Sequence, residues 1–178
     1  MSKYSEVKEF VARQNDKDYN ASCRCSYNCM GWALNIKQWL RPLDTYDMWD
    51  YDCVERDDFI NNLLDDYCND DDAVREYFES LEVDALIDVW GLRFATQEEI
   101  NNEAVTLIAF REKIDFGYDS GSERYYVSDS DFHFRKRING VWTEKMGGTK
   151  IRVCEDDIDS DEWCGGYDGD IYYFVKEL

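Results

Sequence analysis

The sequence predicts an α+β fold in which N-terminal helices pack on a C-terminal antiparallel β-sheet. Apolar residues recur at helical spacing in the first hundred positions and alternate with polar residues in the last seventy. The chain has 178 residues, 44% of them hydrophobic and only one a proline, which is enough to bury a core without disulfide bonds. We therefore expect one domain over residues 1–178, with a helical part at about 1–103 and a sheet part at about 104–178.

Four segments carry apolar side chains three and four positions apart, as amphipathic helices do. They are residues 5–14, 26–40, 57–68 and 71–81. Ser5 suits the N-cap of the first helix, and Pro42 disfavours helix at the end of the second. Thr96–Glu99 has a capping-box pattern that predicts one more short helix. Residues 43–54 are expected to form a loop packed on the body.

The strands are expected in the second part of the chain. The segments with strand character are residues 104–110, 124–127, 132–138, 141–145, 150–153 and 171–175. Asn139-Gly140 is the strongest hairpin signal, because both residues tolerate positive φ. A two-residue turn there sets a register of three pairs, namely Ile138 with Val141, Arg137 with Trp142, and Arg135 with Glu144.

The formal net charge of −20 restricts the possible partners. Direct binding to nucleic acid or to an anionic membrane is disfavoured, because phosphates would be repelled. Either the charge is a solubilising surface, or its carboxylates imitate a phosphate backbone and engage a basic, nucleic-acid-handling protein. The acidic runs that could do so are Asp65-Asp66, Asp70–Asp72 and Glu155–Asp157 with Asp159 and Asp161.

The sequence predicts a cytoplasmic location, which is the host cytoplasm if a phage encodes the chain. The polar start lacks the apolar segment of a signal peptide, and no apolar run reaches the length of a membrane span. Seven cysteines, an odd number without secretory context, indicate reduced thiols. No cofactor is expected.

Cys29 lies where the second helix is expected to begin, directly after Asn28. A thiol at a helix N-terminus is stabilised as the thiolate by unpaired backbone amides and the helix dipole. The amides at Asn28 and Cys29 could also hold an oxyanion. Alternatively, Cys29 is a small buried hydrophobe, as free cysteines commonly are.

His133 is the sole histidine, and it lies on a predicted strand far along the chain from Cys29. A distant cysteine and histidine can form a nucleophile–base pair. Side-chain alternation places His133, Arg135 and Glu144 on one sheet face, so that Glu144 could orient the imidazole. Asp131 is the rival for this role, and Glu144 could instead pair with Arg135.

Three segments carry a resemblance to a set of little-characterised bacterial and phage proteins. They are Asn28-Cys29-x-x-Trp32-Ala33-Leu34, Asp131-Phe132-His133-Phe134-Arg135 and Gly140-x-Trp142-x-x-Lys145-x-Gly147. The layout is similar to that of papain-like cysteine peptidases and cell-wall amidases. The resemblance implies a papain-like fold, a peptide or protein substrate, Cys29 as nucleophile and His133 as base.

The sequence departs from the pattern of these proteins at three positions. Glu144 stands where the set usually has a second histidine, and Met146 replaces a proline. Cys23 occupies the position at which papain-like enzymes keep an oxyanion-hole glutamine.

A zinc site is a further alternative for the cysteine cluster Cys23-x-Cys25-x-x-x-Cys29, with Cys154 or Cys164 as a fourth ligand. The spacing differs from the usual C-x-x-C knuckle, so no metal is expected and Cys23 and Cys25 remain weak candidates.

Two functions are therefore compatible with the sequence. The first is a cysteine hydrolase, a peptidase or amidase, in which Cys29 attacks and His133 transfers the proton. The second is a non-catalytic acidic binding protein, an inhibitor or nucleic-acid mimic of phage or mobile-element origin, that acts on a basic partner protein.

Overall fold

The computed structural model describes residues 2–20, 27–43 and 53–176, and the fold is α+β. The helices are α1 (Lys3–Asn20), α2 (Cys29–Leu34), α3 (Cys53–Asp66), α4 (Asp71–Asp88) and α5 (Gln97–Asn101). The strands are β1 (Leu92–Phe94), β2 (Leu107–Asp119), β3 (Arg124–Ile138), β4 (Val141–Lys145), β5 (Ile151–Val153) and β6 (Tyr172–Lys176). None of the described helices is long and apolar enough to cross a membrane.

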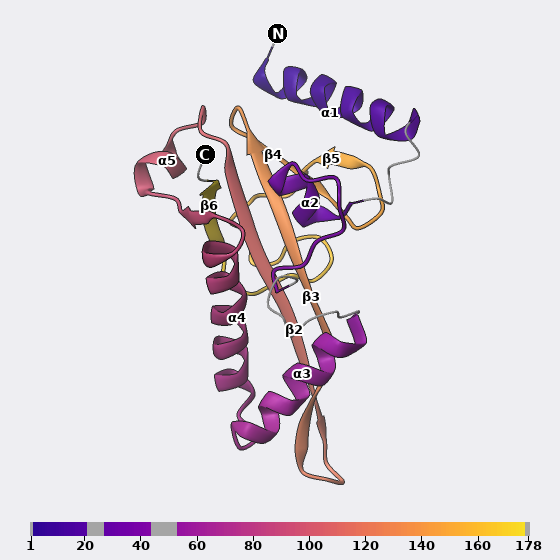
Figure 1. The fold of residues 1–178 in the computed structure, drawn as a ribbon, viewed down its shortest axis with the longest axis vertical. Coiled ribbons are helices and arrows are strands. Elements are labelled where there is room, and N and C mark those ends of the chain that lie inside the picture. Colours follow the sequence, from indigo (N-terminus) through magenta and orange to yellow (C-terminus); the bar gives the residue numbers. More distant parts are fainter. Residues whose placement is uncertain (1, 21–26, 44–52, 177–178) are drawn as a thin grey trace.

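The strands form one six-stranded sheet in the order β1-β6-β2-β3-β4-β5, and every neighbouring pair is antiparallel. The predicted register around Asn139-Gly140 is confirmed, because Arg135 pairs with Glu144 and Ile138 with Val141. β2 and β3 are much longer than their neighbours and continue together past the rest of the sheet (Figure 1).

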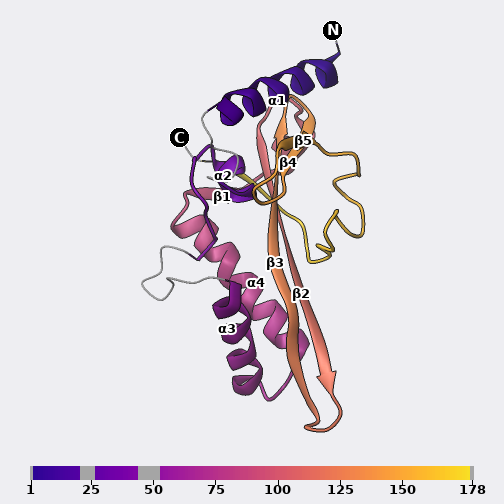
Figure 2. The same ribbon diagram turned by 90° about the vertical axis from the view of Figure 1, so that its right-hand side faces the viewer.

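The sheet has two differently covered faces. Helices α3 and α4 lie on one side of β2 and β3, and the long loop between β5 and β6 lies on the other (Figure 2). We call these sides the helix face and the loop face, and residues 154–171 the acidic loop. On β3, Phe132 and Phe134 belong to the core on the helix face, whereas Asp131 and His133 contact Tyr167 of the acidic loop.

The helix face holds most of the apolar core. One cluster joins α2 and α4 to the upper part of the sheet, where the rings of Phe110 and Phe134 lie 5.1 Å apart. A second cluster, which includes Phe78 and Ile114, packs α3 and α4 on the lower part of β2 and β3. A two-stranded ribbon is marginal alone, so this packing supports the long hairpin.

Helix α3 also satisfies backbone groups on the outer edge of β3. The Asn61 side chain accepts the Val127 N–H at 2.9 Å, and the Asn69 side chain, just after the helix, accepts the Tyr125 N–H at 2.7 Å. Strand β4 pairs only with Arg135–Ile138, so it does not reach these groups. Asparagine side chains thus take the place of a neighbouring strand.

Several predicted element bounds need correction. Helix α2 ends at Leu34 rather than near residue 40, because Asn35 adopts a left-handed conformation (φ 60) and caps it. The predicted strands 124–127 and 132–138 are parts of one strand, β3. Strand β1, Leu92–Phe94, lies within the part predicted to be helical. The capping box at Thr96 and Glu99 is confirmed. Most of the predicted loop 43–54 lies outside the described residues.

Replacement of Asn61 tests how much its hydrogen bond to the outer edge of β3 contributes to stability. Asn61→Ala removes the acceptor of the buried Val127 N–H, and we expect it to lower the free energy of unfolding by about 1 kcal/mol. Asn62→Ala, at the neighbouring exposed position of the same helix, serves as the control. Urea unfolding measures both, and equal effects of the two substitutions would contradict the capping role.

Candidate functional site

Cys29 is the first residue of α2, as the sequence predicts. Asn28 is the N-cap, and its side-chain oxygen accepts the N–H groups of Gly31 (3.1 Å) and Leu40 (3.2 Å). Its amide nitrogen donates to the Leu40 carbonyl at 2.6 Å. The buried Asn28 side chain therefore holds the helix start to the segment that follows α2.

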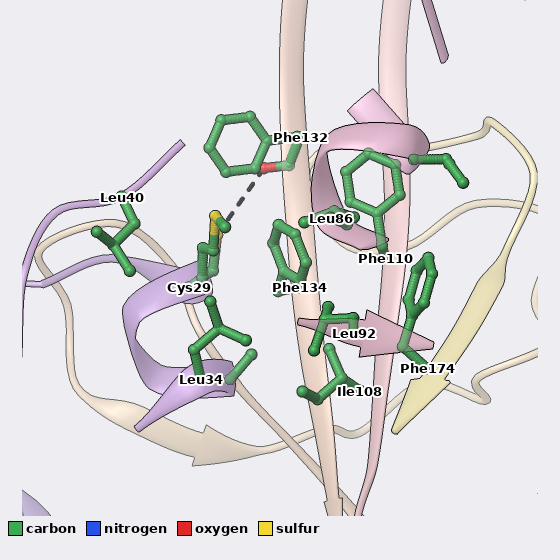
Figure 3. Packing of buried hydrophobic residues seen from close by; sticks show 13 residues of the cluster. Cys29, Leu34, Leu40, Leu86, Leu92, Ile108, Phe110, Phe132, Phe134 and Phe174 are labelled. Atoms are coloured by element: carbon green, nitrogen blue, oxygen red, sulfur yellow. Dashed lines mark hydrogen bonds between the residues drawn. The ribbon is translucent and has the colours of Figure 1, made fainter. Parts of the chain in front are cut away.

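The thiol of Cys29 lies in the apolar core of the helix face. It is buried between Leu40 and the phenyl rings of β3, and Sγ lies 3.9 Å from the Phe132 carbonyl oxygen (Figure 3). Burial raises the pKa of Cys29 to about 12. The helix start was expected to favour the thiolate, but a helix of six residues has a weak dipole and desolvation outweighs it.

His133 points to the other face of the sheet. Its neighbours Phe132 and Phe134 pack with Cys29 on the helix face, so alternation directs His133 to the loop face. His133 is 1% exposed, and its imidazole stacks on Tyr167 with ring centroids 5.0 Å apart and meets Trp163 edge-on. No hydrogen bond joins Cys29 to His133 among the described residues, because the thiol lies beside the Phe132 carbonyl oxygen and the imidazole lies beside Glu144. Their pairing as nucleophile and base stays a prediction.

Glu144 is the centre of a buried charge cluster on the loop face. Its carboxylate lies 3.2 Å from His133 Nε2, accepts Arg135 Nε–H at 2.9 Å and accepts Arg152 Nε–H at 2.8 Å. Burial opposes ionisation of Glu144, but the hydrogen bond with His133 and the charge of Arg135 outweigh it and lower its pKa to about 2. The predicted contacts of Glu144 with His133 and with Arg135 thus both form.

Asp131 does not contact the imidazole. Its carboxylate accepts the Phe132 N–H at 2.8 Å and the Tyr167 hydroxyl at 2.6 Å. Asp131 therefore helps to fix the acidic loop, and Glu144 is the carboxylate that holds His133. Trp163 and Tyr167, which cover the imidazole, were not anticipated because the acidic loop has no periodic pattern.

Arg135 completes the buried cluster. It is fully buried, its guanidinium lies 4.3 Å from the centre of the Trp163 ring, and Nη2 donates to Asp156 at 2.7 Å. A cavity of about 350 Å³ adjoins the cluster. It is lined by Glu144, Arg152, Glu155, Asp156, Glu162, Trp163 and Cys164. Four carboxylates on its wall disfavour an anionic ligand.

A second buried charge cluster, on the helix face, was not expected. Arg56 of α3 is bound by Glu82 of α4 and Glu112 of β2, both nearly inaccessible to solvent. Glu79 lies one turn before Glu82 and is also buried, and its Oε1 atom has no hydrogen-bond partner. The signal in the sequence was the position of Glu79, next to Phe78 in the apolar stripe of the predicted helix 71–81.

Among the described residues, no three histidine, cysteine, aspartate or glutamate side chains are arranged to hold a metal ion. The weak metal candidates Cys23 and Cys25 lie outside these residues. Cys29, Cys154 and Cys164 are free cysteines, and the exposed Cys164 lines the cavity beside Glu144.

Comparison of the chain with protein-family models, with curated proteins and with solved structures finds no match. What the protein does must therefore be inferred from its own residues.

The reactivity of the thiols tests the environment of Cys29. We expect Cys29 to react with iodoacetamide at least tenfold more slowly than the exposed Cys68 and Cys164, because burial keeps it protonated and shielded. Peptide mass spectrometry after timed alkylation measures the rates. Faster labelling of Cys29 than of Cys68 would contradict the buried, protonated thiol.

The low pKa of Glu144 predicts how stability depends on pH. A carboxylate with a folded pKa of about 2 against an ordinary 4.5 stabilises the fold above pH 4.5 and loses this effect as the pH falls to 2. We expect Glu144→Gln to lower the free energy of unfolding by about 3 kcal/mol at pH 7, with a difference that shrinks between pH 4.5 and pH 2.

Urea unfolding at several pH values measures this difference, and Glu98→Gln, at an exposed position of α5, is the control. A constant difference from pH 7 to pH 2 would show that Glu144 acts through shape rather than charge.

Glu79 predicts the opposite dependence on pH. Burial, and after it the charge of Asp170, raises the pKa of Glu79 to about 7, so its ionisation destabilises the fold as the pH rises from 4.5 through 7. We expect Glu79→Gln to raise the free energy of unfolding by about 2 kcal/mol at pH 8 and to have little effect at pH 4. Glu76→Gln, at an exposed position of the same helix, is the matched control. An equal gain in the free energy of unfolding from Glu76→Gln would exclude burial of the Glu79 carboxylate as the cause.

Proposed function

We propose that the chain is a non-catalytic acidic binding protein that covers a basic surface of a partner protein. The observation that carries this proposal is the excess of carboxylates that remains on the surface. Among the described residues, five basic side chains are buried, namely Arg111, Arg135, Lys136, Arg137 and Lys145, and four acidic ones, namely Glu79, Glu82, Glu112 and Glu144. The chain has 40 acidic and 20 basic residues, so nearly all of the acidic excess lies outside the core.

Two of the three buried arginines, Arg111 and Arg137, bind backbone carbonyl oxygens rather than carboxylates. Arg111 donates to the carbonyl oxygens of Ser160 (2.8 Å) and Gly169 (2.6 Å) in the acidic loop. Arg137 donates to the carbonyl oxygens of Ile100 (2.6 Å) and Asn102 (2.7 Å) at the end of α5. Both guanidiniums hold acidic segments in place without neutralising their side chains.

The acidic loop thus presents its carboxylates to solvent from a fixed backbone. Its exposed acidic residues are Glu155, Asp157, Asp159, Asp161, Glu162, Asp168 and Asp170. A dense, ordered set of carboxylates attracts lysine and arginine side chains in the way a phosphate backbone does. The proposed partner is a protein that handles nucleic acid, and the chain acts as its inhibitor or decoy.

The proposal includes a papain-like scaffold that has lost its chemistry. Helix α2 opens at Cys29 and packs on the antiparallel sheet that carries His133, which is the order of elements expected from the resemblance. A cysteine hydrolase requires the thiolate and the imidazole to meet. Cys29 is buried with a raised pKa, and among the described residues it makes no hydrogen bond to His133, so a binding role is the function that the geometry supports best.

We further propose that the chain derives from a phage or mobile element and acts in the host cytoplasm. Cys29, Cys68, Cys154 and Cys164 are free thiols, which suits a reducing compartment.

Release of DNA from a basic peptide tests the proposed function. A labelled DNA duplex is bound to a nona-arginine peptide, and fluorescence anisotropy follows its release as the chain is added. We expect the chain to release the DNA at a lower concentration than polyglutamate of the same net charge does. We also expect the concentration that releases half of the DNA to be at least tenfold higher at about 300 mM salt than at about 50 mM salt. Cys29→Ser should act as the wild type does, because the thiol has no part in binding.

Failure to release DNA at low salt, or release unaffected by salt, would overturn the proposal. Cleavage of the peptide by the wild type but not by Cys29→Ser would favour the hydrolase instead.

A further inference from the structure

The lower half of the β2–β3 hairpin is a two-stranded ribbon that projects from the sheet. Strand β6 pairs only with Ile108–Phe110 of β2, and β4 only with Arg135–Ile138 of β3, whereas β2 and β3 stay paired as far as Asp119 and Arg124. We call residues 113–119 and 124–131 the distal ribbon. Its helix face packs on α3 and α4, while the acidic loop covers the other face only near its upper end (Figure 2).

A tyrosine ring lies on the loop face of the distal ribbon. Tyr126 of β3 is paired with Gly117 of β2, and its side chain is 48% exposed. A Cβ atom at position 117 would lie 2.4 Å from Cζ of Tyr126, so the ring rests directly over the glycine. The absence of a side chain at Gly117 therefore lets an exposed aromatic ring lie against the opposite strand.

Carboxylates flank this ring along both strands. Lys113 lies between Asp115 (3.3 Å) and Asp129 (2.6 Å), both about half exposed, so one ammonium faces two carboxylates. Asp119 follows at the end of β2, where hydrogen bonds from Ser122 and then Gly121 lower its pKa and keep it ionised. Arg124, at the start of β3, is already paired with Asp65 of α3.

We propose that the loop face of the distal ribbon, centred on Tyr126, binds an arginine-rich segment of the basic partner; this inference rests on the proposed function. A guanidinium stacks on a tyrosine ring and simultaneously donates to carboxylates, whereas a lysine ammonium offers no planar surface for stacking. The carboxylates of Asp115, Asp119 and Asp129 lie on either side of the ring along the two strands. This surface fits arginine better than lysine.

The position of the Tyr126 ring is already restricted before a ligand binds. Tyrosine loses little side-chain entropy on binding, and a ring already held against the sheet loses less still. Aromatic residues at the centre of a polar surface commonly dominate the binding energy of an interface. Tyr118 provides an internal contrast, because it is 55% exposed but packs edge-on against Tyr125 at the helix face.

Binding of nona-arginine and nona-lysine peptides to the full chain tests the location, with isothermal titration calorimetry at low salt. We expect Tyr126→Ala to weaken nona-arginine binding about fivefold and nona-lysine binding much less, because the stacking contribution is lost. Tyr126→Phe should bind as the wild type does. Gly117→Ala, which displaces the ring without removing it, should reproduce part of the loss. Tyr118→Ala is the control of similar exposure, and it should stay within twofold of the wild type.

The outcomes separate this inference from the proposed function. If Tyr126→Ala and Tyr118→Ala weaken binding equally, or if neither weakens it, the proposed binding surface around Tyr126 is wrong. Salt-sensitive binding of nona-arginine by the wild type would in that case still support an acidic binding protein. An equal loss of nona-arginine and nona-lysine binding in Tyr126→Ala would likewise exclude arginine stacking. If the wild type does not bind nona-arginine at low salt, the proposed function fails and this inference fails with it.

Discussion

The alternation of side chains along β3 is the constraint on which the rest of the structure depends. Phe132 and Phe134 point to the helices, while His133 and Arg135 point to the acidic loop. The strand therefore contributes apolar rings to the core under the helices and charged side chains to the cluster around Glu144. A shift of register by one residue would place the charged groups in the apolar core, so the pattern strongly specifies a single arrangement.

Several charged groups are buried, and most of them have a specific compensation, Glu79 being an exception. Glu144 is surrounded by His133, Arg135 and Arg152, whereas Arg111 and Arg137 are compensated by backbone carbonyl oxygens. Removing ions from water is costly unless nearly all of their hydrogen-bonding capacity is used. These interactions fix the position of the acidic loop and of α5. They also leave the carboxylates of those segments in water, where a partner can reach them.

Much of the fold could be predicted from the sequence because its signals are local. The Asn139-Gly140 turn set the register of β3 and β4, and with it the contact between Glu144 and His133. Thr96 and Glu99 likewise identified the start of α5. The extent of β2 and β3 could not be predicted in this way, because the lower ribbon depends on packing against α3 and α4.

The candidate site was harder to predict, since its geometry depends on distant segments. The positions of Cys29 at a helix start and of His133 on a strand were both predicted correctly, but the contacts that each side chain makes depend on how α2 and the acidic loop pack on β3. The contacts of His133 with Trp163 and Tyr167 come from an irregular loop. Tyr126 and Gly117 become informative only when they are seen as a cross-strand pair.

The asparagine-capped edge of β3 has a consequence for association between copies of the chain. A strand without a neighbour offers its backbone groups to any other exposed strand, and such edges lead to aggregation. Here the N–H groups of Tyr125 and Val127 are already occupied by Asn69 and Asn61. These two side chains therefore disfavour the pairing of another strand with this part of β3, while the loop face of the hairpin stays accessible to a different protein.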